Sequence, residues 1–207
     1  MKVLLLNGSP NEHGCTFRAL TEVANSLKEN GVDSEILQIG KGAIHGCIGC
    51  GGCSKLGHCV FGEDGVNEAV ERAKEADGLI VGSPVYYASP NGSILSFLDR
   101  MFYSGGRYLT HKPAAAVASA RRAGTTATLD ALNKYFLINQ MPIVSSNYWN
   151  MVHGKAPEDV EKDLEGLQIM RILGQNMAWM LKCIEAGREK GIVCPEGETK
   201  IMTNFIR

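Results

Sequence analysis

The chain has 207 residues, of which 44% are hydrophobic and 21% charged, and its formal net charge is −1. These values are ordinary for a globular protein and exclude the disordered and fibrous classes. The 21 basic and 22 acidic residues form no basic block, so we expect neither a nucleic-acid partner nor an anionic membrane surface as a partner.

The first ten residues, MKVLLLNGSP, predict a strand over 2–7 followed by a turn. The apolar run is shorter than the roughly 7–15 residues of a signal peptide and the roughly 20 of a membrane-spanning helix. We therefore expect a cytoplasmic protein. In that compartment thiols stay reduced, so clustered cysteines indicate metal binding or redox chemistry before structural disulfides.

Helical and strand-like segments alternate along the next part of the chain. Apolar residues at helical spacing predict helices over 16–29, 65–76, 92–103 and 125–137, and apolar runs predict strands over 32–39, 78–84, 113–119 and 142–147. Strands buried on both faces have such unbroken runs, and helices between them imply parallel crossovers. The sequence predicts one α/β domain, residues 1–207, with a five-stranded doubly wound sheet.

The last part of the chain has a different pattern. Apolar residues, several of them methionines, recur at intervals of three and four from Pro157 to about Lys190 and predict one long helix over 157–190. Its length and its methionine stripe favour a contact with a partner subunit in a homodimer or homotetramer. The alternative is a long core helix of a monomer. Residues 192–207 are predicted to form an irregular tail.

The loop NGSPNEHGCT joins the first strand to the first helix. In an open parallel sheet, ligands bind beyond the carboxyl ends of the strands, and a helix N-terminus there offers free N–H groups to an anion. The loop lacks the lysine of a P-loop, with Cys15 in its place, and it lacks a G-x-G-x-x-G fingerprint. It favours a single phosphate monoester, with hydroxyls from Ser9 and Thr16. The alternative is an ordinary turn with Thr16 near the helix cap.

Two further loops follow the third and fourth strands, GSPVYYASPNGS and SARRAGTT. We expect Pro84 to end its strand, which would free the backbone of Val85 and Tyr86 for a ligand. Tyr86 and Tyr87 can wall a flat ring. Three loops on one rim describe a site for a planar heterocycle that carries a phosphate.

Together these three motifs resemble the flavodoxin-like NAD(P)H-dependent FMN reductases over roughly residues 1–150. The resemblance implies the strand order 2-1-3-4-5 and bound FMN. The implied cofactor-binding residues are Ser9, Pro10, Asn11, Gly14, Cys15 and Thr16 around the phosphate, Pro84, Val85, Tyr86 and Tyr87 against the ring, and Ser119, Ala120 and Gly124 closing the ring site. No catalytic side chain is assigned, because the flavin performs the chemistry.

Four cysteines, Cys47, Cys50, Cys53 and Cys59, lie in the glycine-rich loop 44–64. Within the same family, the iron–sulfur flavoproteins have this spacing, and three closely spaced cysteines can wrap around one [4Fe–4S] cube. Zinc and free thiols are the alternatives. We expect the loop at the carboxyl rim beside the first strand, near the flavin of its own or a neighbouring subunit.

The predicted function is an FMN-dependent oxidoreductase that takes hydride from NAD(P)H and passes electrons to a quinone-like molecule, free flavin or the cluster. One alternative is an iron–sulfur electron carrier that serves a ferredoxin-like protein, and another is a redox sensor that uses Cys15.

Some further residues have more than one interpretation. Arg121 and Arg122 are either ligand contacts or solvated charges. The segment 147–154 either borders the flavin or packs on a partner subunit, or its aromatic cluster is an apolar cover. We expect Asp99 and Arg100 to form a surface charge pair. Cys183 and Cys194 are interpreted as buried or incidental thiols.

Overall fold

The computed structural model describes residues 1–203 and 205. Its parallel sheet has the order β2-β1-β3-β5-β6, from β1 (Lys2–Asn7), β2 (Asp33–Gln38), β3 (Gly78–Tyr86), β5 (Ala114–Ala120) and β6 (Met151–His153). The short β4 (Ser89–Pro90) folds back antiparallel onto the end of β3. Apart from this added hairpin, the order is the one predicted, and the flavodoxin-like fold is confirmed.

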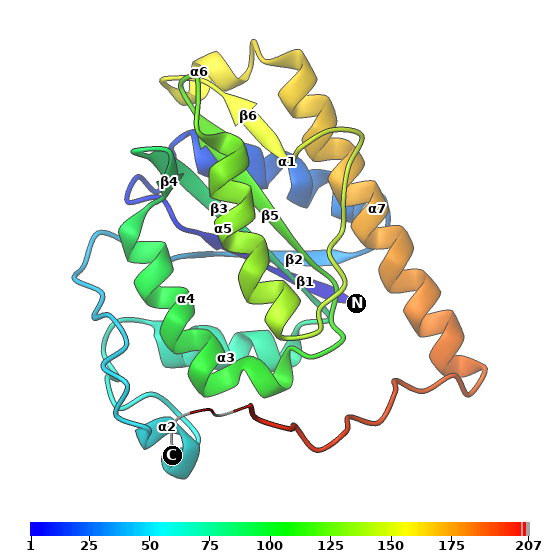
Figure 1. The fold of residues 1–207 in the computed structure, drawn as a ribbon. Coiled ribbons are helices and arrows are strands. Elements are labelled where there is room, and N and C mark those ends of the chain that lie inside the picture. Colours follow the sequence, from blue (N-terminus) through cyan, green and yellow to red (C-terminus); the bar gives the residue numbers. More distant parts are fainter. Residues whose placement is uncertain (204, 206–207) are drawn as a thin grey trace.

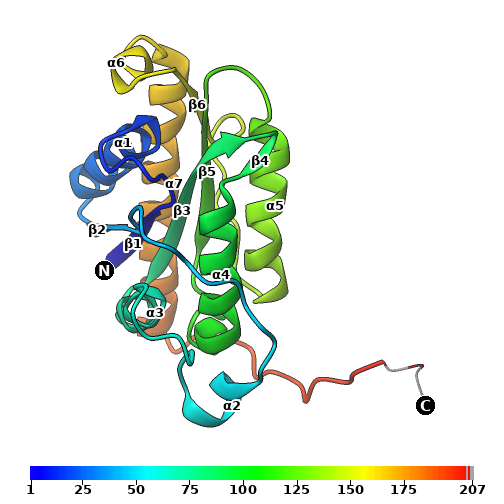
Figure 2. The same ribbon diagram turned by 90° about the vertical axis from the view of Figure 1, so that its left-hand side faces the viewer.

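Helices cover both faces of the sheet (Figures 1 and 2). One face carries α1 (Cys15–Glu29) and α7 (Leu164–Glu189), and the other carries α3 (Val66–Glu75), α4 (Gly92–Gly105) and α5 (Thr125–Ile138). Two shorter helices are α2 (Gly52–Leu56) and α6 (Pro157–Val160), and a 3-10 turn spans Gly106–Tyr108. The short α2 lies inside the cysteine loop, for which the sequence analysis named no helix.

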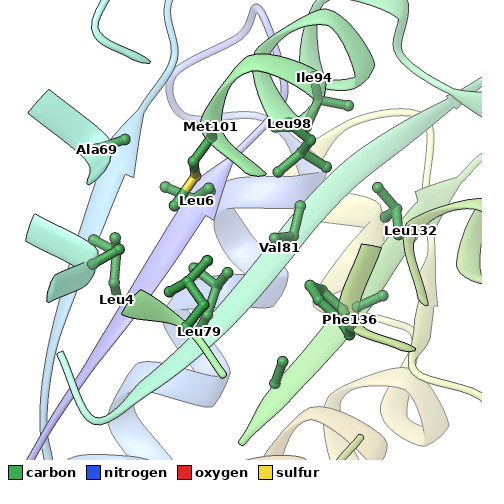
Figure 3. Packing of buried hydrophobic residues seen from close by; sticks show 14 of the residues in the cluster. Leu4, Leu6, Ala69, Leu79, Val81, Ile94, Leu98, Met101, Leu132 and Phe136 are labelled. Carbon is green, nitrogen blue, oxygen red and sulfur yellow. The ribbon is translucent and has the colours of Figure 1, made fainter. Parts of the chain in front are cut away.

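Each central strand feeds two hydrophobic cores. Leu4 and Leu6 of β1 pack toward α3 and α4, whereas Val3 and Leu5 of the same strand pack toward α1 and α7. Figure 3 shows the first of these cores. Because every second residue faces the same side, a strand covered on both sides must be apolar throughout, and each fully buried side chain stabilises by about 1.5–3 kcal/mol.

The fifth parallel strand is β6 (Met151–His153), so the prediction of a strand over 142–147 is wrong. The chain pairs briefly with β5 where the N–H of Ala114 donates to the carbonyl of Pro142. It then leaves the sheet and returns at Asn150, whose carbonyl accepts from the N–H of Ala118. Ser146 explains the excursion, because its hydroxyl bonds within the loop to Asn150 and competes with the strand ladder.

The predicted helix over 157–190 is two helices, α6 and α7, separated at residues 161–163. The Asp163 carboxylate accepts the N–H of Gly166 at 2.9 Å and caps the start of α7. It also accepts the N–H of His153 at 2.6 Å, which ties β6 to the break. The apolar spacing continues from Val160 across the break, so periodicity alone could not reveal it.

The C-terminal segment from residue 192 has no regular secondary structure in its described part, residues 192–203 and 205. Residues 204, 206 and 207 of the predicted irregular tail lie outside the description. In the same described part of the chain, none of the helices combines the length and the apolar character that spanning a membrane would require.

Candidate functional site

A cavity of about 460 Å³ lies at the carboxyl ends of β1, β3 and β5, where the predicted loops meet. It is lined by Ser9, Asn11, His13, Gly14, Cys15, Thr16, Pro84, Val85, Tyr86, Ser119, Ala120, Arg121, Gly154, Lys155, Ala156 and Pro157. Ten of the thirteen predicted cofactor-binding residues are in this lining. The other three, Pro10, Tyr87 and Gly124, lie outside it.

The first loop is held by hydrogen bonds to the sheet. The N–H of Gly8 donates to the carbonyl of Gly82 at 2.8 Å, and a Cβ on Gly8 would lie 2.7 Å from that oxygen. The side-chain amide of Gln38 donates to the carbonyl of Ser9 at 2.6 Å, and the Ser9 hydroxyl accepts the N–H of Asn11. The loop is therefore fixed before any ligand enters.

The loop ends at Gly14, which is the N-cap of α1 and has no side chain with which to cap it. The first turn, Cys15–Phe17, carries no charge, so its backbone N–H groups and the positive end of the helix dipole remain available to an anion. The hydroxyls of Thr16 and Ser119, both almost fully buried, lie 2.8 Å apart and link α1 to β5 at the cavity floor. This corner of the cavity has the chemistry of a phosphate site.

The second loop differs from its prediction, because β3 continues through Pro84 to Tyr86. Val85 and Tyr86 pair with β4 in a hairpin whose two turn residues, Tyr87 and Ala88, have φ values of 49° and 56°. A turn of this kind normally favours Asn-Gly, so the hairpin tip is strained. The Tyr87 side chain points into solvent, whereas Tyr86 is half-exposed at the cavity edge.

The third loop ends at Gly124, whose φ is 92°. A Cβ there would lie 2.7 Å from the Cα of Ala88 and from Cγ1 of Val85. Gly124 thus supports the hairpin from behind and does not face the cavity. Of the two adjacent arginines, Arg121 lines the cavity and Arg122 does not.

Gly154, the last residue of the segment 147–154, lines the cavity, as one interpretation of that segment expected; residues 155–157 also line it and were missed by the sequence analysis. They follow β6, and the carboxyl end of the fifth strand could not be located while that strand was assigned to 142–147. The aromatic residues Tyr148 and Trp149 lie outside the lining, packed edge to face against each other at 4.7 Å.

The Cys15 thiol lies in the cavity wall and donates to the carbonyl of Gly154 at 3.5 Å. Burial raises the pKa of this thiol; its own backbone N–H lowers the pKa, and the carboxylates of Asp159 and Glu158 raise it again, leaving it above the ordinary value. The protonated form is therefore favoured at neutral pH. Because the thiolate is the reactive form, this speaks against a redox sensor that uses Cys15.

The cysteine loop does not stay at the carboxyl rim, which corrects the prediction. It runs from the end of β2 along α4, and α2 lies at the opposite end of α4 from β4 (Figure 1). There the Cys53 thiol approaches the carbonyl of Tyr103 at 3.7 Å. Tyr103 lies eleven residues after Gly92, about 16 Å along the helix axis, so groups bound in the two regions of one chain could not touch.

All four cysteines of the loop line one cavity of about 230 Å³, together with Ile48, Gly49, Gly51, Val60, Phe61, Arg100 and Tyr103. The donor set is four thiols, as an iron–sulfur cube requires. Over residues 1–203 and 205, however, His, Cys, Asp and Glu side chains form no group of three or more that could hold a metal ion. The chemistry of the donor set fits a cluster, but the four thiols would have to move closer together to hold one.

Arg100 adjoins this cavity, and its side chain is only 1% exposed, so the predicted surface pair with Asp99 is wrong. Its guanidinium binds the Asp64 carboxylate through both oxygens, and the Asp99 carboxylate instead accepts the Tyr135 hydroxyl at 2.5 Å. Burial raises the pKa of Asp64. The hydrogen bonds and charge of Arg100, together with the N–H groups of His45 and Val66, lower the pKa by more than burial raises it, so the pKa of this carboxyl lies below its usual range. Cys183 and Cys194 are exposed, which corrects the buried interpretation.

Comparison with known proteins agrees with this geometry. Residues 1–156 match the family described as NADPH-dependent FMN reductase. An iron-sulfur flavoprotein of Methanocaldococcus jannaschii is 34% identical over 193 residues, which cover 89% of this chain and 100% of that protein.

Two solved structures share the fold at low identity. A flavone reductase has a TM-score of 0.70 at 18% identity, over 89% of this chain and 64% of its own. A flavoenzyme NAD(P)H:(acceptor) oxidoreductase of Paracoccus denitrificans has a TM-score of 0.60 at 16% identity, over 85% and 96%. The family match covers the loops that build the rim cavity, and the family indicates a flavin cofactor. The chain belongs to the NADPH-dependent FMN reductase family and lies close to the iron–sulfur flavoproteins within it.

Proposed function

We propose that the protein is an FMN-dependent oxidoreductase that accepts hydride from NAD(P)H at the rim cavity. The observation that carries the proposal is the composition of that cavity. Its phosphate corner combines the uncharged start of α1 with the hydroxyls of Ser9 and Thr16, and its ring wall combines Pro84, Val85 and Tyr86. One end thus suits a dianionic monoester and the other a flat apolar ring.

In this proposal the protein binds and orients, and FMN, when bound, supplies hydride acceptance and single-electron release. The helix N-terminus would hold the phosphate, and the hydroxyls of Ser9, Thr16 and Ser119 could form hydrogen bonds to the phosphate and to the chain that joins it to the ring. The backbone of Ala120 and Arg121, which also line the cavity, would be available to the polar edge of the ring.

The nicotinamide nucleotide would approach from the open side of the cavity. Three exposed basic residues, His13, Arg121 and Lys155, are part of the cavity lining. Their position supports recognition of the phosphates of NAD(P)H, because guanidinium and ammonium groups bind phosphate through charge-assisted hydrogen bonds.

Replacing Arg121 with alanine should raise the KM for NADPH roughly tenfold or more, since a hydrogen bond to a charged group contributes about 1.5–3 kcal/mol. The kcat should change little, because the interaction is uniform binding rather than chemistry. Arg122→Ala is the matched control, as Arg122 is exposed, adjacent and outside the lining. Steady-state kinetics of both variants decide the matter, and equal KM values would contradict a role for Arg121.

The four-cysteine cavity supports the second part of the proposal, a [4Fe–4S] cluster on Cys47, Cys50, Cys53 and Cys59. Because this cavity lies far along α4 from the flavin cavity, a cluster would exchange electrons with the flavin of a neighbouring subunit in a homodimer or homotetramer. The exposed Trp179 of α7 and the exposed Tyr148 and Trp149 are candidates for the subunit contact. A cytoplasmic, reducing location would keep the thiols available.

A specific observation favours an alternative function, that of an electron carrier between proteins. Cys47 and Cys50 are exposed, so a cluster held there would be open to a docking ferredoxin-like protein. In that case the chain would carry electrons between proteins, and NAD(P)H would not be a substrate.

Anaerobically purified protein tests these assignments. We expect stoichiometric FMN, bleaching of the flavin absorbance on mixing with NADPH or NADH, and about four iron and four acid-labile sulfide per chain. Bleaching by reduced ferredoxin but by neither nucleotide would favour the carrier. Colourless protein that stays colourless in excess FMN would overturn the flavin site itself, and flavin without iron would remove only the cluster.

A further inference from the structure

The cysteine loop is anchored to the body of the protein through one buried cation. Arg100 lies on α4 and has the largest of the fully buried side chains. Its Nε donates to Sγ of Cys59 at 3.1 Å, and its Nη1 donates to the carbonyl of His45 at 3.2 Å. Its Nη2 donates to the carbonyl of Phe61 at 2.9 Å. With two bonds to Asp64, all five N–H groups of the guanidinium have acceptors.

These acceptors come from both ends of the loop. His45 precedes the first cysteine, whereas Cys59, Phe61 and Asp64 end the loop. The Phe61 ring lies 5.1 Å from the guanidinium carbon and stacks on the His45 ring at 4.6 Å. Arg100 therefore holds the two ends of the loop together, next to the cavity that all four thiols line.

The charge balance at this position is also defined. A guanidinium buried to this degree needs an anionic partner. Asp64 is that partner, and its own side chain is only 11% exposed. The contact to Cys59 uses the Nε–H, which Asp64 leaves free. Hydrogen bonds to cluster sulfur and nearby charge are the means by which proteins set reduction potentials.

We infer that Arg100, balanced by Asp64, is a positioning residue for the metal centre: it clamps the two ends of the cysteine loop and sets the reduction potential through its hydrogen bond to Cys59. The inference rests on the cluster of the proposed function. It assigns a role to a residue outside the cysteine motif, on the helix that follows β4. A cation next to the cluster stabilises the reduced form, which carries one more negative charge, and Asp64 offsets part of that effect.

The two charges can be removed separately, with opposite expected results. In holo protein, Arg100→Met should make the cluster potential more negative, and Asp64→Asn should make it more positive, as measured by spectroelectrochemical titration. Arg100→Met should also lose its iron at about 10–100-fold lower chelator concentration, because metal affinity typically falls by that factor when a hydrogen bond to a metal ligand is lost. Arg100→Lys keeps the charge and should keep a potential nearer the wild type.

Arg107→Met is the matched control. Arg107 also reaches the loop, donating to the carbonyl of Gly57 at 3.4 Å, but it makes no bond to Cys59. If the ion pair had only a structural role, Arg100→Met and Asp64→Asn would both leave the potential unchanged or would both shift it in the same direction. Equal potentials in wild type and both variants, or shifts of one sign, would overturn the tuning role.

The clamp has a readout that needs no metal. Lys55 is the sole trypsin site between residues 44 and 64, and it lies on α2 in the middle of the loop. Arg100→Met should be cut after Lys55 at least about tenfold faster than wild type, because local opening controls cleavage. Unchanged cutting would overturn the clamp. Retention of FMN at the rim shows that each variant is folded.

The two levels of the proposal fail differently. Wild-type protein without iron after anaerobic reconstitution would overturn the cluster, and with it the tuning role, while the trypsin comparison would still decide the clamp. Wild-type protein with iron, but with variants that match it in potential, would leave the proposed function standing and overturn only the role of Arg100.

Discussion

Replacing Gly14 with aspartate should make the protein slightly more stable and nearly unable to bind FMN. Gly14 is the N-cap of α1, with φ −84° and ψ −170°, an extended conformation open to any residue. An aspartate cap would satisfy free N–H groups and the helix dipole, which adds about 0.5–1 kcal/mol. The same carboxylate would occupy the corner that we assign to the phosphate.

The loss of affinity follows from like charges at short range. At about 4 Å and an effective dielectric constant of about 20, two unit charges repel by about 4 kcal/mol, so we expect the Kd for FMN to rise roughly a hundredfold or more. Gly14→Ser is the control, because serine caps the helix without a charge. Its Cβ, like that of aspartate, would lie 3.1 Å from Cβ of Asn11, so this tight contact is common to both variants and cancels in their comparison.

Riboflavin, which has no phosphate, gives the second control for this prediction. Fluorescence titrations should show that Gly14→Asp loses FMN affinity selectively and that its riboflavin affinity is near that of wild type. Urea unfolding of the flavin-free protein should show a small gain in stability for both variants. Equal loss of FMN and riboflavin would mean that the phosphate lies elsewhere.

The rim cavity was predictable because its determinants are local. The strand before each loop is an unbroken apolar run, since residues such as Leu4 and Leu5 face two different cores. The carboxyl ends of parallel strands meet at one edge, so loops that follow such runs must converge there. Ten predicted residues accordingly line one cavity.

The features that escaped prediction depend on partners distant in the chain. The short edge strand β6 pairs only at Met151–His153, which is too few residues to leave a pattern. Asp99 and Arg100 read as a charged pair on a helix surface, because the acceptor that buries Arg100 is Asp64, thirty-six residues earlier. The cysteine loop runs along α4 and away from the rim, and its amino-acid composition gives no information about that path.

Gly124→Ala should strongly destabilise the protein. The residue has φ 92°, a region in which a Cβ costs about 1–2 kcal/mol. The new methyl group would also lie 2.7 Å from the Cα of Ala88, a backbone atom that cannot rotate away. Overpacking of this kind costs about 1–3 kcal/mol, so the unfolding free energy should fall by about 2–5 kcal/mol.

Gly31→Ala separates the two causes. Gly31 has φ 73°, and nothing among the described residues lies within 4 Å of its Cβ position, so only the backbone cost of about 1–2 kcal/mol applies there. The difference between the unfolding free energies of the two variants, measured in urea, gives the cost of the steric contact between the new methyl group and the hairpin tip. Since the hairpin carries Val85 and Tyr86 into the flavin cavity, Gly124→Ala should also weaken FMN binding, although Gly124 does not line the cavity. The affinity for riboflavin should fall equally, because the displaced wall faces the ring. A selective loss of affinity for FMN would instead place Gly124 near the phosphate.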